Sequence, residues 1–469
     1  MLAVRVDTPV GQSSAVTNAL ASLTTTVNVS DAAAPTSGQK LVATSPTTAA
    51  WQSDDWLHII KEGGCVGDGV TDDSVAWAAA VATGRNIYIP EGYSILTSTG
   101  VTLAQGQAIK GDSWIRVTET GSAGRAPNGG SNIIWGATTG NCISISAAFA
   151  SNYLSHISVV QKVGTTPTSG AGISVGDNTN RVYNVLLENV VVNGCYNGFH
   201  IFGKVNSNVY VNCCAWTYVN AGIYINSAVP YGGGFWMGTY VYGHSTQSIN
   251  SVGILCDSFD TCLMANTTIA GGGKGMWLRG NVGICYQMTI TNLVIENQIG
   301  NSPLQIGDGT YGSQDCIISG LHIWDNTATY AMVIGAQSTR TTISVGNSSN
   351  THNITDSGVG TKLTDFSSSV GTITLSGSYT KLRGVTVPNL TVSSTATYQD
   401  IQGNTFTNAP SINAAAWATS IIKNNIGLAD ILTSIAATPL YKGQLSTVAG
   451  AIYMAVATAS SADWKQVSN

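Results

Sequence analysis

The sequence predicts an all-β solenoid, a right-handed parallel β-helix with a short capping helix. Two short blocks recur at intervals of about 20 to 30 residues beyond residue 140, separated by Asn and Gly turns. One face of each block is apolar, and helical periodicity is scarce in this region. Strands of this kind bury a core only when successive coils stack, so a solenoid fits best and a β-sandwich is the alternative.

The two blocks differ in pattern. The first has apolar residues at its first, fourth and sixth positions, and its copies begin at Leu154, Leu187, Ile290 and Ile318. The second reads Gly, apolar, any residue, apolar, and its copies begin at Gly172, Gly198, Gly222, Gly253 and Gly275. We expect the inward residues of each coil to pack on the next coil, and uncharged Asn, Ser and Thr to form ladders between coils.

Composition excludes several function classes. Of 469 residues only 9% are charged, against about 25% in ordinary domains, and the net charge is −5 without a Lys/Arg cluster. We therefore expect no nucleic-acid binding and no basic face for a membrane. No apolar run is long enough for membrane insertion, and the start at Met1 lacks a secretion signal, which predicts a product made in the host cytoplasm. The nine cysteines lack a CxxC spacing and are expected to be free and buried.

The amino-terminal elements come next. Residues 1–52 are rich in Ala, Thr and Ser, and we expect a flexible tether there, with a possible short helix at Ala15–Leu23. After it, Gly67-Asp-Gly-Val-Thr-Asp-Asp73 reads as a turn that caps a helix ending near Gly84, followed by a strand around Ile87. The aspartates of this turn are interpreted as capping residues.

The carboxyl-terminal part differs from the middle. Residues 346–428 keep strand-like alternation but lose large inward residues, so thinner or trimer-forming coils are expected. Residues 429–469 should form a small β module whose hairpin turns near Ala449 and Gly450.

The turn at 67–73, the helix, and the segment Ile87-Tyr-Ile-Pro-Glu-Gly-Tyr93 before the coils resemble the pectate-lyase-superfamily entry module of bacteriophage tailspikes and depolymerases. The resemblance covers about residues 54–345, and residues 37–51 and 460–465 are similar to segments of phage fibre proteins. It implies a homotrimer in the phage tail that binds, and often cleaves, a bacterial surface polysaccharide. Residues 1–52 would then attach to other tail proteins, residues 53–345 would form the β-helix, and neither a cofactor nor a metal is expected.

Candidate catalytic residues are carboxylates, because glycoside hydrolysis generally uses two of them across one bond. Glu296 follows the strand 293–295 and should point outward, and Trp324, followed by Asp325, is its equivalent one coil later. Asp257 and Asp260 begin another coil about one period earlier. The resemblance to tailspike glycosidases implies a pairing of Glu296 with Asp260 or Asp325.

Aromatic residues crowd the middle third, where sugar rings could stack on them. The segment 231–242 is read as a Gly-rich loop that borders a carbohydrate groove. The predicted substrate-binding residues are Trp236, Tyr240, Tyr242, Trp277, Arg279 and Trp324.

Other interpretations stay open. Glu296 could be a solvated strand-end residue and the aspartates turn residues. A polysaccharide lyase would use a base and cations drawn from Lys204, His200, Lys274 and Arg279. A non-catalytic receptor-binding or structural tail protein is a further alternative, whereas a secreted plant-wall pectinase is disfavoured by the missing secretion signal.

Overall fold

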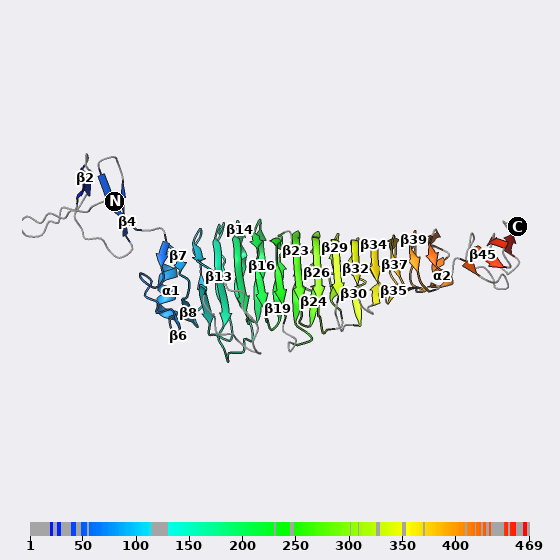
Figure 1. Ribbon diagram of the computed structural model, residues 1–469, viewed down its shortest axis with the longest axis horizontal. Coiled ribbons are helices and arrows are strands. Elements are labelled where there is room, and N and C mark those ends of the chain that lie inside the picture. Colours follow the sequence, from blue (N-terminus) through cyan, green and yellow to red (C-terminus); the bar gives the residue numbers. More distant parts are fainter. Residues whose placement is uncertain are drawn as a thin grey trace, which may run out of the picture.

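The computed structural model describes most of the chain. The described residues are 19–21, 26–29, 39–43, 48–53, 56–113, 130–228, 231–243, 248–300, 302–307, 309–324, 329–348, 353–368, 371–408, 410–417, 419–423, 425–427, 431–432, 445–448, 451–455 and 463–466. Figure 1 shows coils stacked side by side along one long axis, narrowing toward β39.

Two large sheets, in which every pairing is parallel, form a parallel β-helix, as predicted. The first, called the long sheet, has 23 strands: β5 (Trp56–His58), β6 (Asp68–Asp72), β7 (Asn86–Ile89), β8 (Ser94–Thr97), β10 (Ala108–Gly111), β11 (Asn132–Trp135), β13 (Tyr153–Gln161), β15 (Leu186–Asn193), β17 (Val209–Val211), β18 (Cys214–Trp216), β20 (Gly234–Met237), β21 (Tyr240–Tyr242), β23 (Cys262–Ala270), β26 (Met288–Glu296), β29 (Ile317–Trp324), β32 (Thr342–Ser348), β34 (Lys362–Ser368), β36 (Lys381–Arg383), β37 (Thr386–Val387), β39 (Asp400–Gln402), β40 (Thr405–Phe406), β42 (Ile421–Lys423) and β43 (Ile426–Gly427).

The second sheet has 13 strands, and a third sheet has three. The second sheet contains β9 (Val101–Thr102), β12 (Asn141–Ile145), β14 (Ala171–Tyr183), β16 (Asn197–Asn206), β19 (Ala221–Ser227), β22 (Val252–Ser258), β24 (Lys274–Leu278), β27 (Leu304–Ile306), β30 (Tyr330–Ile334), β33 (Asn353–Asp356), β35 (Thr372–Leu375), β38 (Asn389–Val392) and β41 (Ser411–Ile412). The third sheet contains β25 (Cys285–Tyr286), β28 (Ser313–Gln314) and β31 (Ser338–Thr339).

The core is built from columns of inward residues that stack from coil to coil. One column of the long sheet pairs Leu187, Tyr210, Trp236, Met264, Ile290, Ile318, Ile343, Leu363, Leu382 and Ile401 in register. All of these side chains are buried in one continuous core. Since strand neighbours lie about 4.8 Å apart, each inward side chain contacts its equivalent in the next coil.

The glycines of the second repeat block have a steric reason. Each stands just before an inward residue of the second sheet, where the chain passes over side chains of the long sheet. A Cβ on Gly253 would lie 2.4 Å from Ile269 Cγ2 and 2.6 Å from the carbonyl oxygen of Gly275. A Cβ on Gly222 would lie 2.5 Å from Val241 Cγ1. Glycine therefore recurs in the second block because the two large sheets approach each other closely at this position.

Asparagines bend the long sheet at the same position in several coils. Asn189, Asn212, Asn266 and Asn292 have φ values of 50° to 55°. Asn tolerates this left-handed conformation better than most residues. The amide of Asn212 donates to Asn189 at 3.2 Å, and that of Asn292 donates to Asn266 at 2.9 Å. These are the ladders of like side chains that the composition predicted.

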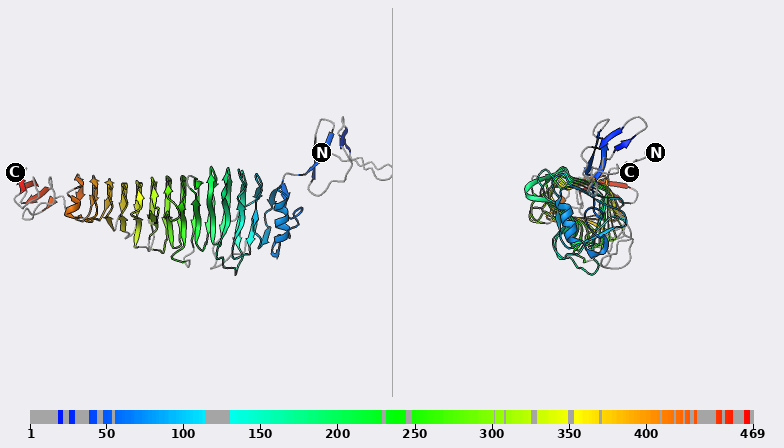
Figure 2. Two further views of the ribbon diagram at one scale, coloured as in Figure 1. Left: turned by 180° about the vertical axis from the view of Figure 1, so that it is seen from behind. Right: turned by 90° about the vertical axis from the view of Figure 1, so that its left-hand side faces the viewer.

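The entry module closes one end of the solenoid. Helix α1 (Ser74–Ala82) buries Trp77 and Val81 in the common core, and the end-on view of Figure 2 shows it lying across the coil. Asp72 accepts hydrogen bonds from the amide and hydroxyl of Ser74, and Asp73 accepts the amides of residues 66 and 67. Asp72 thus caps the first amide of α1 as predicted, whereas Asp73, the N-cap residue, makes no capping bond with its side chain and stabilises the turn.

The terminal regions add two small sheets. The amino-terminal sheet contains β1 (Ala19–Ala21), β2 (Thr26–Val29), β3 (Gln39–Ala43) and β4 (Thr48–Ser53). The predicted helix is wrong at 19–21, and a purely flexible tether does not describe this part, because β3 and β4 pair along the whole of β3. The carboxyl-terminal sheet contains β44 (Ile431–Leu432), β45 (Leu445–Val448), β46 (Ala451–Ala455) and β47 (Trp464–Gln466). Val448 pairs with Ala451, which confirms the predicted hairpin.

Coils shorten toward the carboxyl end. Ile290 pairs with Ile318 in the next coil, whereas Leu363 already pairs with Leu382, so fewer residues separate equivalent positions. The predicted boundary at 345/346 falls inside β32, and the long sheet passes it without a break. A second helix, α2 (Ala414–Trp417), follows β41. Among the described helices, none is long and apolar enough to cross a membrane. All nine cysteines are free and buried, as predicted.

Candidate functional site

The long sheet carries an outward row of side chains at the ends of its strands. We define the aromatic row as Trp216, Tyr242, Ala270, Glu296 and Trp324, which pair in register in that order. Beside it, Tyr240, Thr268, Val294 and His322 form a parallel outward row. Both rows exist because inward and outward residues alternate along each strand.

Aromatic rings flank the carboxylate in this row. Trp216 lies 5.7 Å from Tyr240 and 5.1 Å from Tyr242 between ring centroids, with interplanar angles of 41° and 42°. On the other side, Trp324 is 41% exposed and contacts His322 edge to face at 5.7 Å. Half-exposed rings of this kind present the apolar faces on which pyranose rings stack.

Glu296 lies between these aromatic groups. It pairs with Ala270 on one side and with Trp324 on the other, so the predicted equivalence of Glu296 and Trp324 is confirmed by the register. Its carboxylate is partly exposed, and no hydrogen bond joins it to another described side chain. Ala270, its neighbour on the other side, is small and buried. The carboxylate is therefore accessible to a ligand that lies along the row.

The structure bears differently on the two carboxylates that were predicted to pair with Glu296. Asp325 lies outside the described residues, although Trp324 before it pairs with Glu296. Asp260 precedes β23, whereas Glu296 pairs with Ala270 at the end of that strand. Two strand segments of about 13 Å each, joined by the bend at Asn266, separate these ends. The predicted pairing of Asp260 with Glu296 is therefore wrong.

Asp257 lies on the second sheet, at a β-bulge. The register shifts between Ile225 and Asn226 opposite it, which turns the side chain toward the surface layer. Arg279 donates two hydrogen bonds of 2.5 Å to its carboxylate, and the hydroxyl of Tyr224 donates a third at 2.9 Å. Both oxygens of this 1% exposed carboxylate are thus occupied. Asp257 acts as the residue that positions Arg279 and Tyr224, rather than as a free acid or base.

Trp277 is covered by cations. The ammonium of Lys274 lies 3.4 Å from its ring centroid, and the guanidinium carbon of Arg279 lies 5.0 Å away. Lys274 also donates to Gln305 Oε1 at 3.1 Å. A sugar would therefore meet positive charge here as well as an aromatic face. We define Tyr224, Asp257, Lys274, Trp277 and Arg279 as the cation cluster.

His200 extends this cluster along the second sheet. Its ring stacks on Tyr224 at 4.9 Å and on Phe202 at 5.0 Å. Burial lowers the pKa of His200 to about 4, so the imidazole is neutral at neutral pH. Burial also raises the pKa of Tyr224, and the Asp257 carboxylate adds to that shift. Lys204, the other residue of the predicted lyase set, donates to the carbonyl oxygen of Thr179 at 3.1 Å.

The structure places Trp236 differently from the prediction that it binds substrate. Its side chain is fully buried, stacks on Tyr210 at 4.0 Å and meets Phe199 edge to face at 5.9 Å. The segment 231–242 is not a groove-bordering loop, because it holds β20 and β21 of the long sheet. Alternation places Trp236 inward, whereas Tyr240 and Tyr242 remain partly exposed.

Sequence reasoning did not place His322 in the outward rows and did not connect Trp216 with Glu296. The signal was present as coil spacing, because the five positions of the aromatic row follow one another at nearly even intervals along the chain. Across the described ranges, no three His, Cys, Asp or Glu side chains gather as metal ligands would.

Comparison with known proteins finds likeness in structure and not in sequence. No family model and no curated protein matches the sequence. The A-module of the Azotobacter vinelandii mannuronan C-5 epimerase AlgE6 is 13% identical, with 79% of this chain and 98% of that chain covered and a TM-score of 0.49. The Dettilon tailspike protein is 12% identical, with 85% and 76% covered and a TM-score of 0.44. Tailspike protein 3 of bacteriophage CBA120 is 12% identical, with 92% and 73% covered and a TM-score of 0.46. The chain is thus similar in structure to phage tailspikes and to an epimerase module, while the parallel pairing of its own strands defines its fold.

Proposed function

We propose that this protein is a phage tailspike that binds a bacterial surface polysaccharide along the aromatic row and hydrolyses it there. The observation that carries the proposal is the register of Tyr242, Ala270, Glu296 and Trp324, which sets a carboxylate between aromatic faces. Adjacent positions are about 4.8 Å apart, a repeat close to the length of one sugar unit. A polysaccharide that runs along the solenoid axis would then meet one side-chain position per sugar.

Hydrolysis would use Glu296 with Asp325. One carboxyl group protonates the leaving oxygen, and the other either attacks the anomeric carbon or activates a water molecule. Asp325 is chosen from the sequence, because it directly follows Trp324, the residue that pairs with Glu296. The separation of the two carboxyl groups decides between retention and inversion, and the stereochemistry of the product would report it.

The test is a cleavage assay on capsule and O-antigen from a panel of bacteria, read as released oligosaccharides. We expect Glu296→Gln to lower turnover at least about 100-fold, the usual scale for losing a positioned proton donor or acceptor. Binding should stay nearly unchanged, because the amide keeps the shape of the side chain. Glu188→Gln is the matched control: Glu188 lies on the same sheet, but it accepts a hydrogen bond from Tyr153 at 2.8 Å and is not in the aromatic row. Unchanged turnover in Glu296→Gln would remove the proposed catalytic role.

A polysaccharide lyase at the cation cluster is the second candidate. It is favoured by the neutral His200 stacked on Tyr224, beside Lys274 and Arg279, since β-elimination needs a base and cations that neutralise a uronate. The products separate the two reactions. A lyase leaves an unsaturated sugar with ultraviolet absorbance, which depends on His200, whereas a hydrolase releases saturated reducing ends. Binding to the panel without either product would indicate a non-catalytic receptor-binding protein.

The remaining parts of this proposal concern assembly. A location in the phage tail, a homotrimer and attachment through residues 1–52 follow from the resemblance of the sequence to tailspikes. Sedimentation at micromolar concentration should give three chains per particle, and a monomer would contradict the trimer. Removing residues 1–52 should leave polysaccharide binding intact and abolish incorporation into phage particles.

A further inference from the structure

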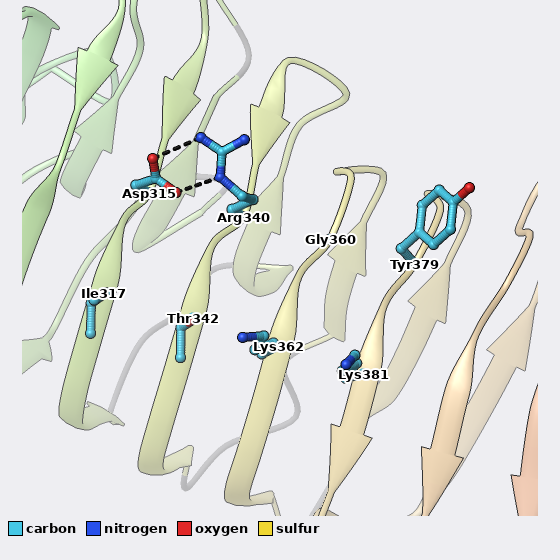
Figure 3. Close-up of a pocket in the computed structure, with 8 residues that line it drawn as sticks. All are labelled: Asp315, Ile317, Arg340, Thr342, Gly360, Lys362, Tyr379 and Lys381. Carbon is cyan, nitrogen blue, oxygen red and sulfur yellow. Dashed lines mark hydrogen bonds and ion pairs between the residues drawn. The ribbon is translucent and has the colours of Figure 1, made fainter.

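The short coils carry a groove away from both candidate sites. It has a volume of about 420 Å³, within the usual range for ligand sites. Figure 3 shows its two rows of side chains, one on the turns that precede the strands and one on the strands. The turn row contains Asp315, Arg340, Gly360 and Tyr379, and the strand row contains Ile317, Thr342, Lys362 and Lys381.

Two lysines give the groove its charge. Lys362 and Lys381 are exposed and pair in register on adjacent strands, about 4.8 Å apart along the axis. Like charges directly opposite one another destabilise a sheet. Among the residues that the structure describes, no carboxylate forms an ion pair with either lysine. A bound anion would relieve this repulsion.

The nearby carboxylates have arginine partners. Arg340 donates to both oxygens of Asp315, at 2.6 and 2.7 Å, and lowers the pKa of that carboxyl. Asp400 pairs in register with Lys381, but its oxygens accept from Arg383 and Gln402, each at 2.5 Å. The groove therefore keeps the positive charge of its two lysines.

A notch and an aromatic platform stand above the lysines. Residues 315, 340, 379 and 398 all have φ values between 53° and 60°, so this turn accepts side chains, yet position 360 is glycine. A Cβ on Gly360 would be in ordinary van der Waals contact with Arg340 at 3.7 Å, so a side chain fits there and its absence leaves a notch. Tyr379 stacks on Tyr398 at 5.0 Å, and each is 53% exposed. The pair presents a face for a sugar ring beside the notch.

We propose that this groove binds an acidic sugar unit, with its carboxylate on Lys362 and Lys381 and its ring against Tyr379. The polysaccharide that this protein binds is then anionic, a statement that rests on the proposed function. Nucleic acid is the weaker choice, because the chain carries a net charge of −5 and the groove offers only two lysines for a backbone of many phosphates.

The experiment measures binding of an oligogalacturonate to the full-length protein by calorimetry, with the methyl-esterified chain as the uncharged probe. We expect binding of the acid form only, weakened by added salt. The double variant Lys362→Gln/Lys381→Gln should weaken it at least about tenfold, since charge-assisted hydrogen bonds are lost. Gly360→Asn keeps the charges and the turn but fills the notch, so it should also weaken binding. Lys162→Gln, a change at an exposed lysine far along the chain, is the matched control.

Several results would overturn the inference. These are equal affinity for the acid and ester forms, unchanged affinity in the double variant, and tighter binding of a single-stranded DNA oligomer of equal length. A change of oligomeric state in the double variant without loss of affinity would assign the lysines to a subunit contact instead. Because the assay needs no cleavage, it separates this inference from the proposed hydrolysis: Glu296→Gln should bind the oligogalacturonate as the unmodified protein does.

Discussion

The long coils around β23, β26 and β29 and the short coils around β34, β36 and β39 solve the same packing problem with different chain lengths. The inward column continues through both, from Met264 and Ile290 to Leu363 and Leu382. The second region spends fewer residues on each coil because the connections and strand ends shrink. Coil length is therefore a property of the turns, while the apolar column sets the fold.

The two regions also differ in which of the two large sheets carries the larger side chains where the sheets approach each other. In the long coils, Gly253 and Gly275 leave room for Ile269 and Ile295 of the long sheet. In the short coils, Asn353 and Thr372 precede the inward residues Ile354 and Ile373, as these glycines precede theirs, although the register shifts between Tyr330 and Met332. The long-sheet column continues as Ser348 and Ser368. Large residues on one sheet are thus matched by small ones on the other.

The outward surfaces differ more than the cores. The long coils present aromatic rings with Glu296 among them, and the short coils present paired lysines beside stacked tyrosines. Because the fold requires little of outward positions, these differences point to function rather than to stability.

The largest expected stability effect is in the aromatic core of the long coils. Trp236→Ala should lower the free energy of unfolding by about 3 to 5 kcal/mol, because it removes a buried ring stacked on Tyr210. Leu382→Ala, at the equivalent column position of a short coil, should cost about 2 to 5 kcal/mol and lie below it. Thermal unfolding of both variants measures the difference. A larger loss for Leu382→Ala would reverse the comparison.

A smaller effect tests the steric role of the glycines in the second sheet. Gly253→Ala should destabilise the protein by about 1 to 3 kcal/mol, since the added methyl group meets Ile269 and a backbone oxygen. Thr372→Ala, the matched change in a short coil, should cost less because it removes atoms from a half-buried position. Equal losses would show that the glycine column has no steric role.

The smallest effect concerns a buried carboxyl group in the short coils. Asp356 is 2% exposed and accepts hydrogen bonds from Thr380 at 2.7 Å, Thr361 at 3.0 Å and the amide of Gly358 at 3.0 Å. Burial raises the pKa of Asp356 above its usual 3.8. The folded state then binds the proton more tightly than the unfolded chain, so this group stabilises least once the pH has risen through the folded pKa.

Asp356→Asn should therefore raise the thermal midpoint at neutral pH and change it little below pH 3.8. The amide keeps the acceptor for Gly358 and Thr361, while the hydroxyl of Thr380 turns to accept. A lower midpoint at neutral pH would mean that the ionised carboxylate stabilises the coil.

Much of the fold was predictable from residue types alone. The glycine block, the capping aspartates and the hairpin at 445–455 each have a local cause, either a close approach or a turn, that leaves a signature in the sequence. Glu296 and Trp324 were matched correctly because they lie one coil apart in a region of even spacing.

The failures came where register decides the outcome. Trp236 was predicted to border a groove because its segment is rich in Gly and aromatic residues. Side chains alternate between the two faces of a strand, and the position of Trp236 in β20 turns it inward. Asp260 seemed close to Glu296 by count, yet it stands at the opposite end of the strand. Counting residues along the chain identifies the coil to which a residue belongs. Only the pairing of its strand shows where in that coil its side chain lies.

The most direct test of the contrast between the two outward surfaces is steady-state cleavage of the polysaccharide that the panel identifies. The account predicts that Glu296→Gln lowers kcat at least about 100-fold with little change in KM, because it alters the reacting group. It predicts that Lys362→Gln/Lys381→Gln raises KM with kcat nearly unchanged, because the short coils bind the polysaccharide and take no part in the reaction. If the lysine variant lost kcat, or if Glu296→Gln changed only KM, the division between reaction in the long coils and binding in the short coils would be contradicted.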